Sequence, residues 1–480
     1  MTMPSSESPS SCCASCISLK DRCPRPQGLV NLLITKVCLF ALLFGIVWSI
    51  TGKECLPGGN LFGIIILFIC SVLGGKLVGM IHMPVQTCVC VRVGMLLAGL
   101  LLRNVPYITD AVFIDTHWSA ALRSIALSII LTRAGLGLNP EALSRLKAVC
   151  VRVAVGPCMV EACIGAVVSH FLLGLPWVWG FLLGFVLAAV SPAVVFPSML
   201  LLQREGYGVE KGIPTLLIAA GSFDVILAIT GFSTCLGIAF STGQRKFFCI
   251  VAGMILGMFL YCFPSNDQED LVLRRTLMLL GLSIFSVFTS NVIGFAGAGS
   301  LCTLVLAFLA ALGWKTEKVS YIRITLTFGR SWDVFQPLLF GLIGAEITIK
   351  ALSPSTVGLG MACILIGLVI RLLVTFLLVH YGGFNLKEKL FISVAWLPKA
   401  TVQAAIGSKA LDMARKEGDE ALIKFGLDVL TLAVLAILIT APVGALGIGL
   451  AGPRLLARQP GLEPATFRLQ GELLSHDRHR

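Results

Sequence analysis

The stretch WVWGFLLGFVLAAVSPAVVFPSMLLL, residues 177–202, decides how this chain folds. It is long and apolar enough to cross a lipid bilayer as a helix, which takes about 20 residues. Ser191 and Pro192 nevertheless interrupt it in the middle, and we expect Pro197 to interrupt it again. A proline lacks a backbone donor and frees a carbonyl of the preceding turn. Such freed groups are tolerated at membrane depth only where protein or a water-filled cavity covers them. The stretch therefore predicts a broken helix inside a larger membrane protein.

The composition of the 480-residue chain agrees with a membrane protein. Hydrophobic residues make up 56% of it and charged residues only 13%, with a mean hydropathy of +0.92. Soluble domains carry about 25% charged residues, so this chain has too little charge for a water-soluble domain of its size. We expect an all-α polytopic membrane protein with about 13–14 transmembrane helices. The candidate segments begin near Leu29, Leu61, Cys88, Ala120, Ala148, Trp177, Ile213, Phe247, Leu271, Gly297, Trp332, Val357, Lys389 and Leu427.

The formal net charge of +12 comes mostly from basic residues at the ends of these segments. Basic residues gather in cytoplasmic loops, and their distribution predicts a cytoplasmic N-terminal tail, residues 1–28. A membrane domain, residues 29–452, and a C-terminal tail, residues 453–480, follow. The charge does not indicate a nucleic-acid partner. The sequence also lacks the phosphate loop, nucleophile elbow and metal-ligand spacing of enzymes, so we expect neither catalysis nor a resident cofactor.

Three consecutive segments in the first half of the chain have counterparts in the second half. Glu161 lies in the segment before the broken one, and Asp224 lies in the segment after it. In the second half, Arg371 precedes the segment FISVAWLPKATVQAAIGS, which Pro398 and Lys399 interrupt. The two sets are seven segments apart, and this odd offset inserts them with opposite orientation. Broken helices at matching places in two inverted halves indicate the binding site of a secondary transporter. One such proline alone would indicate only a kink.

Ionisable residues inside the segments identify the chemistry of that site. A charge at the bilayer centre costs at least about 2.5–3.5 kcal/mol, so such residues usually pair or line a cavity. Lys76 and Arg92 lie nearer to segment ends, where long side chains can reach the interface. The residues expected at membrane depth are Glu161, Asp224, Glu346, Arg371 and Lys399.

Arg371 is permanently charged and needs an acidic partner, for which Glu161 and Asp224 are the two candidates. If Glu161 pairs with Arg371, Asp224 is free to hold a proton or a small hard cation, but not both. That competition is the chemistry of a proton/cation exchanger. If Asp224 pairs with Arg371 instead, it is a structural residue. Backbone carbonyls of the broken helices, with Ser191 or Thr401, would complete the oxygen shell of a cation.

Several of these stretches together resemble one family. They are LRSIALSIILTRAGLGL, GPCMVEAC, GFVLAAVSPAVVFPSMLLLQ, AAGSFDVILAITGF and NLKEKLFISVAWLPKATVQAAIGS. Over roughly residues 28–456 the chain is similar to the animal NHA branch of the sodium/proton antiporters, sodium/hydrogen exchanger subfamily B of solute carrier family 9. The branch lies within the cation:proton antiporter superfamily.

The resemblance implies an NhaA-like fold in membrane lipid, with two crossing broken helices, and a homodimer. A core of helices at about 120–242 and 332–450 would move in an elevator-like shift, and dimerisation helices would lie among residues 29–102 and 247–313. The implied activity is exchange of Na⁺ or Li⁺ for protons, which serves pH homeostasis. Na⁺ or Li⁺ would bind at Asp224, with Glu161 and Arg371 as the supporting pair. The implied crossing residues are Ser191, Pro192, Pro398, Lys399 and Thr401.

The chain departs from the family at the centre of this site. The family has two consecutive acids after GSF, whereas this chain has Asp224 and Val225. The change removes two carboxylate oxygens and one negative charge from a cation site. Two functions stay open: an antiporter that the change impairs, and a transport-inactive paralogue that acts as dimer partner or regulator. A sodium-coupled symporter would need a larger and more polar cavity. We expect the plasma membrane as host, with sperm flagellar, endosomal and mitochondrial membranes as alternatives.

Overall fold

The computed structural model describes most of the membrane domain. The described residues are 29–80, 87–112, 114–137, 147–240, 246–265, 268–294, 297–315, 317–351 and 354–458. The predicted N-terminal tail and all but the first residues of the C-terminal tail lie outside them.

The described residues form helices and no β-strand apart from one isolated bridge between Tyr207 and Arg458. The helices of the first half are α2 (Leu29–Thr51), α3 (Asn60–Gly79), α4 (Thr87–Asn104), α5 (Ile108–Ala111), α6 (Thr116–Gly137), α8 (Lys147–Leu173), α9 (Trp177–Ala188), α10 (Pro192–Arg204) and α11 (Ile213–Ala239). Those of the second half are α12 (Lys246–Cys262), α13 (Leu271–Val292), α14 (Ala298–Trp314), α15 (Lys318–Glu346), α16 (Pro354–Val379), α17 (Leu386–Ala395), α18 (Thr401–Glu417) and α19 (Glu420–Leu455).

The predicted all-α membrane fold with two broken helices is confirmed. Each of the fourteen predicted segments overlaps a helix, although the one expected from Trp332 already begins at Lys318, and the two interrupted segments are the pairs α9–α10 and α17–α18. Among the described residues, nine helices are long and apolar enough to cross a membrane. One expectation was wrong: Pro197 lies inside α10 and does not break it. Pro192 instead begins α10, where its missing N–H group would have had no partner in the helix.

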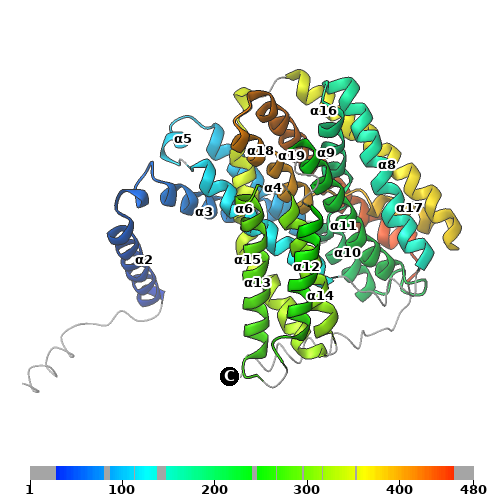
Figure 1. The fold of residues 1–480 in the computed structure, drawn as a ribbon, viewed down its shortest axis with the longest axis horizontal. Helices are drawn as coiled ribbons and strands as arrows, with labels where there is room; N and C mark the ends of the chain where they lie inside the picture. Colours follow the sequence, from blue (N-terminus) through cyan, green and yellow to red (C-terminus); the bar gives the residue numbers. More distant parts are fainter. Residues whose placement is uncertain are drawn as a thin grey trace, which may run out of the picture.

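The two inverted sets of three segments lie side by side on one side of the body (Figure 1). α8 packs against α9 and α16, α11 lies against α8 and α9, and α18 packs along α19. Small residues allow the close contact of α8 with α9. A Cβ atom built on Gly165 would lie 3.0 Å from the Cα of Gly184. Close packing of this kind, rather than a hydrophobic driving force, holds helices together in lipid.

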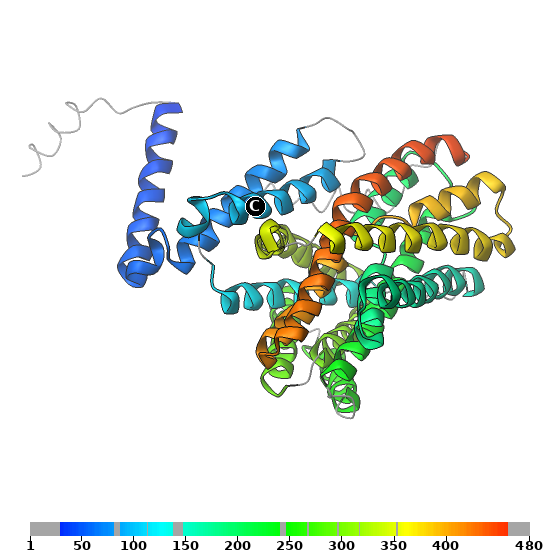
Figure 2. The same ribbon diagram turned by 90° about the horizontal axis from the view of Figure 1, so that it is seen from above.

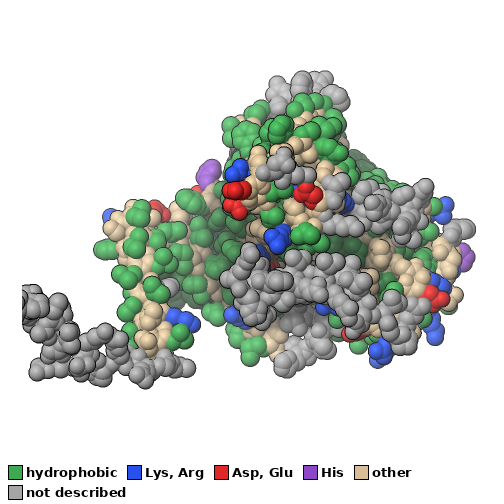
Figure 3. Space-filling view, turned by 90° about the horizontal axis from the view of Figure 1, so that it is seen from below, with side chains coloured by type: hydrophobic (Ala, Val, Ile, Leu, Met, Phe, Trp, Pro, Cys, Tyr) green, Lys and Arg blue, Asp and Glu red, His purple; other side chains and the backbone are tan. Residues whose placement is uncertain are grey.

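The outer surface is predominantly apolar, as a protein surrounded by lipid requires. On the described part of the face seen in Figure 3, hydrophobic side chains are widespread and charged side chains are few. α2 stands apart from the rest of the molecule (Figures 1 and 2), and its apolar side chains are exposed, among them Leu33, Leu39 and Leu42. A polytopic protein with such a surface is an integral membrane protein.

Candidate functional site

The two helix breaks meet in the interior of the protein. The N–H group of Ser191, in the first break, donates to the carbonyl of Pro398, in the second, at 2.9 Å. The hydroxyl groups of Ser191 and Thr401 lie 3.4 Å apart. Because Pro192 begins α10 and Thr401 begins α18, the positive ends of two half-helix dipoles lie at this crossing. The structure thus brings the predicted crossing residues together.

Four buried charges surround the crossing. Arg371 of α16 contacts the Oε2 atom of Glu161 on α8, and Lys399 of the second break lies 2.7 Å from the Oε1 atom of the same residue. The Nη2 atom of Arg371 also lies 3.3 Å from Oδ1 of Asp224 on α11. None of the four residues is more than 2% exposed. With all four ionised, two negative and two positive charges cancel, which makes their burial tolerable.

Arg371 does not choose one of the two acids considered as its partner, because its guanidinium group contacts both Glu161 and Asp224. Its contact with Glu161 is the closer one, and its contact with Asp224 is long for a hydrogen bond. The other oxygen of Asp224, Oδ2, accepts the N–H group of Val190 at 2.7 Å. Asp224 is 0% exposed. In this conformation both of its oxygens therefore have protein partners, and its role as carrier stays a prediction.

Side chains also occupy the carbonyl groups at the end of α9. A helix leaves its last four carbonyls without partners, and they carry negative partial charge. Gln403 donates to the carbonyls of residues 186 and 189 at 3.1 and 2.6 Å. Lys399 donates to the carbonyl of residue 187, and Arg371 to that of residue 188. Gln403 was not among the residues predicted from the sequence, although a lone amide in the apolar stretch ATVQAAI is a visible signal.

A cavity of about 430 Å³ adjoins this crossing. Pro192, Ser222, Val225 and Thr401 line it together with residues of α4, α6 and α15. Asp224 is absent from that lining and points toward Arg371 instead. The position that adjoins the cavity is thus the one at which this chain carries a valine.

Glu346, which we expected at membrane depth, lies outside the crossing. It ends α15, where it pairs with Arg123 of α6 at 2.7 Å and with Arg415 of α18 at 2.9 Å. Arg123 also pairs with Asp412 of α18 at 2.5 Å. We call these four residues the α6–α15–α18 ion cluster; two of them, Glu346 and Arg415, border a second cavity of about 880 Å³. This cluster could not be predicted from the sequence, because up to 289 residues separate its partners along the chain.

Arg92 also differs from expectation. Its side chain does not reach toward the membrane interface but is 8% exposed, and it donates to the carbonyl of Ala193 on α10 at 3.0 Å. Arg92 therefore connects α4 to the first residues after the helix break.

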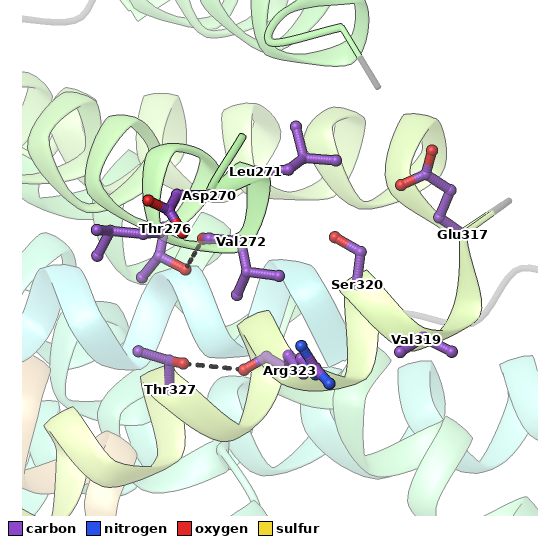
Figure 4. A pocket seen from close by; sticks show the side chains of 10 residues that line it. Asp270, Leu271, Val272, Thr276, Glu317, Val319, Ser320, Arg323 and Thr327 are labelled. Atoms are coloured by element: carbon purple, nitrogen blue, oxygen red, sulfur yellow. Dashed lines mark hydrogen bonds between the residues drawn. The ribbon is translucent and has the colours of Figure 1, made fainter. Parts of the chain in front are cut away.

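A further cavity, of about 940 Å³, lies between the N-terminal ends of α13 and α15, away from the crossing (Figure 4). Its charged lining residues are Asp270, Glu317 and Arg323. The hydroxyl groups of Thr276 and Thr327 donate to carbonyls of their own helices, α13 and α15. Within the part of the chain that the structure describes, no three His, Cys, Asp or Glu residues are arranged to hold a metal ion.

Comparisons with known proteins agree on one family. The family model described as "sodium/hydrogen exchanger, transmembrane" matches residues 59–451. Sodium/hydrogen exchanger 9B2 from Homo sapiens is 61% identical over 446 residues, which are 91% of this chain and 82% of the relative. Sodium/hydrogen exchanger 9B1 from Homo sapiens is 49% identical over 464 residues, which are 95% of this chain and 89% of the relative.

A solved structure shows the same fold. The sodium proton antiporter MjNhaP1 from Methanocaldococcus jannaschii, at pH 8, superposes with a TM-score of 0.64 at 19% sequence identity. The match covers 82% of this chain and 98% of that one.

Proposed function

The chain belongs to the sodium/hydrogen exchanger family, and from that membership we propose that it exchanges Na⁺ or Li⁺ for protons across a membrane. The Asp224 carboxylate would carry the cation and the proton in turn. The observation that supports this proposal is the position of Asp224, which lies against the crossing of the two broken helices, bonded to the backbone of the first break. Ser222 and Val225, which flank Asp224 in the sequence, line a cavity.

The charges at the crossing favour exchange of one cation for one proton. The ionised cluster of Glu161, Asp224, Arg371 and Lys399 has no net charge. Either a proton or a Na⁺ ion on Asp224 brings the cluster to the same charge of plus one. Arg371 must then move away from Asp224, because its contact occupies an oxygen that a cation needs. Exchange by this single carboxylate would be electroneutral.

The wider mechanism that we propose follows the family resemblance. The core helices at about 120–242 and 332–450 would shift against dimerisation helices among residues 29–102 and 247–313, in an elevator-type movement. The protein would act as a homodimer in lipid, and the exposed apolar face of α2 offers surface for contact with lipid or a second copy. The plasma membrane remains the proposed host.

A second candidate function is supported by two specific observations. Asp224 is fully buried with partners on both oxygens, and the residue that adjoins the cavity is Val225. A hard cation that enters this cavity would meet an apolar side chain where it needs oxygen ligands. Under this candidate the protein does not transport ions and acts as a dimer partner or regulator of active relatives.

One experiment separates the two candidates. The purified chain is reconstituted in liposomes, and a Na⁺ gradient drives the dissipation of a pH gradient. Under the first candidate the unmodified protein dissipates the gradient, and Asp224→Asn abolishes this activity. Under the second candidate the unmodified protein is inactive, and Val225→Asp is required for exchange. An Asp224→Asn variant that exchanges at the unmodified rate rejects Asp224 as the carrier.

A further inference from the structure

Gln403 and Asp224 bind opposite ends of one peptide group. The Nε2 atom of Gln403 donates to the carbonyl of Ala189 at 2.6 Å. The N–H group of the same peptide, which belongs to Val190, donates to Oδ2 of Asp224 at 2.7 Å. We infer that Gln403 is a positioning residue that tunes the competition between proton and cation at Asp224 through the Ala189–Val190 peptide. This inference rests on the proposed exchange function.

No helical hydrogen-bond ladder fixes the orientation of the Ala189–Val190 peptide. It lies in the break between α9 and α10, where Ala189 has a ψ angle of 130° and Ser191 a ψ angle of 107°, both outside the helical range. Neither its carbonyl nor its N–H group therefore belongs to a regular helical ladder. The amide of Gln403 comes from the opposite broken helix, α18, so the two halves of the site are joined at this peptide.

The bonding of Gln403 itself indicates that its donor group is the part that matters. The residue is 0% exposed, and its Nε2 atom makes two hydrogen bonds to backbone carbonyls of the first break. Its Oε1 atom is buried and has no hydrogen-bond partner in the structure. A buried acceptor without a donor is costly, and each case calls for an explanation. The side-chain amide of Gln403 thus keeps its N–H groups bonded to carbonyls of the first break, and its oxygen is left without a hydrogen bond.

The effect on Asp224 follows from the chemistry of hydrogen-bonded amides. A donor on a peptide carbonyl polarises the peptide and strengthens the bond that its N–H group donates. A hydrogen bond to a carboxylate favours the ionised form, and losing it favours the protonated form. The charged groups that face Asp224 are Arg371, Lys399 and Glu161. The thiol of Cys158 also lies 4.0 Å from the backbone carbonyl of Asp224.

The test measures cation binding and so needs no transport. The full chain is purified in detergent, and the rise in melting temperature caused by Na⁺ is recorded between pH 5 and pH 9. Protons compete with Na⁺ for Asp224, so the stabilisation disappears as the pH falls. For Gln403→Met we expect the midpoint of this loss to move up by about one pH unit, a tenfold change in the competition. If Gln403→Met does not fold, Gln403→Leu, which also lacks the donors and adds no charge, carries the same test.

A matched control removes a hydrogen bond from the other break. Thr440 accepts the N–H group of Lys399 at 3.1 Å and donates its own hydroxyl to the carbonyl of Ala436 at 2.7 Å. Thr440→Val should lower the melting temperature without moving the pH midpoint. The inference fails if Gln403→Met leaves the midpoint in place, or if Thr440→Val moves it equally, while the unmodified protein still responds to Na⁺. If Na⁺ neither stabilises the unmodified protein nor drives exchange, the proposed function fails and the inference fails with it.

Discussion

Replacing Glu161 by glutamine removes the acid on which two buried cations depend. Glu161 contacts Arg371 through Oε2 and Lys399 through Oε1, the latter at 2.7 Å. The side chains of all three residues are at most 3% exposed. In Glu161→Gln the crossing keeps two cations and only one carboxylate, that of Asp224. Its net charge becomes plus one among side chains that are at most 3% exposed.

The size of the effect follows from the burial of these partners. Removing one partner of a buried ion pair costs about 3–5 kcal/mol, because a charge is left uncompensated. Lysine can lose its proton when buried, whereas arginine stays charged. Release of the Lys399 proton would limit the cost, so we expect a loss of about 3 kcal/mol in the free energy of unfolding.

A second substitution tests the reasoning more sharply than the first alone. Lys399→Met in the Glu161→Gln background leaves Asp224 with Arg371 and restores a net charge of zero. The double variant should therefore be more stable than Glu161→Gln, although each single substitution is destabilising. Unfolding of the purified chain in mixed micelles, titrated with sodium dodecyl sulfate, gives the free energies for the double-mutant cycle.

An exposed acid serves as control for the loss of a carboxylate. Glu420, in the first turn of α19, is exposed, and Glu420→Gln should change the free energy of unfolding by less than about 0.5 kcal/mol. The reasoning is refuted if Glu161→Gln also costs less than about 1 kcal/mol. It is equally refuted if the double variant is no more stable than Glu161→Gln.

Two further substitutions test the packing around the site. Asp412→Asn weakens the 2.5 Å ion pair with buried Arg123. By the same titration, the free energy of unfolding should fall by about 1.5–3 kcal/mol. No measurable loss would mean that the α6–α15–α18 ion cluster does not hold α18 in place. Gly184→Val puts a side chain against the backbone of Ala162 and should prevent accumulation of folded protein, as measured by size-exclusion chromatography. Gly137→Ala, where nothing lies within 4 Å of the added Cβ atom, should accumulate normally; equal yields of both variants would contradict the close α8–α9 contact.

The sequence by itself determined the helices, their breaks and the identity of the buried charges. Segment length and composition suffice for a membrane helix, because the bilayer sets both. Pro192 and Pro398 mark the breaks because proline acts on its own turn. Glu161 and Arg371 could be singled out because a charge at membrane depth is too costly to occur without a reason.

Only the tertiary structure decided which atoms pair at the site. That Arg371 contacts both acids, and that Lys399 shares Glu161 with it, depends on how α8, α11 and α16 pack. The orientation of Asp224 toward Arg371 and of Val225 toward the cavity depends on the rotation of α11. No periodicity in an apolar helix specifies that rotation, because all of its faces are similarly hydrophobic. Hydrogen bonds and ion pairs change with shifts of less than about 1 Å, and those positions exist only once the helices have packed.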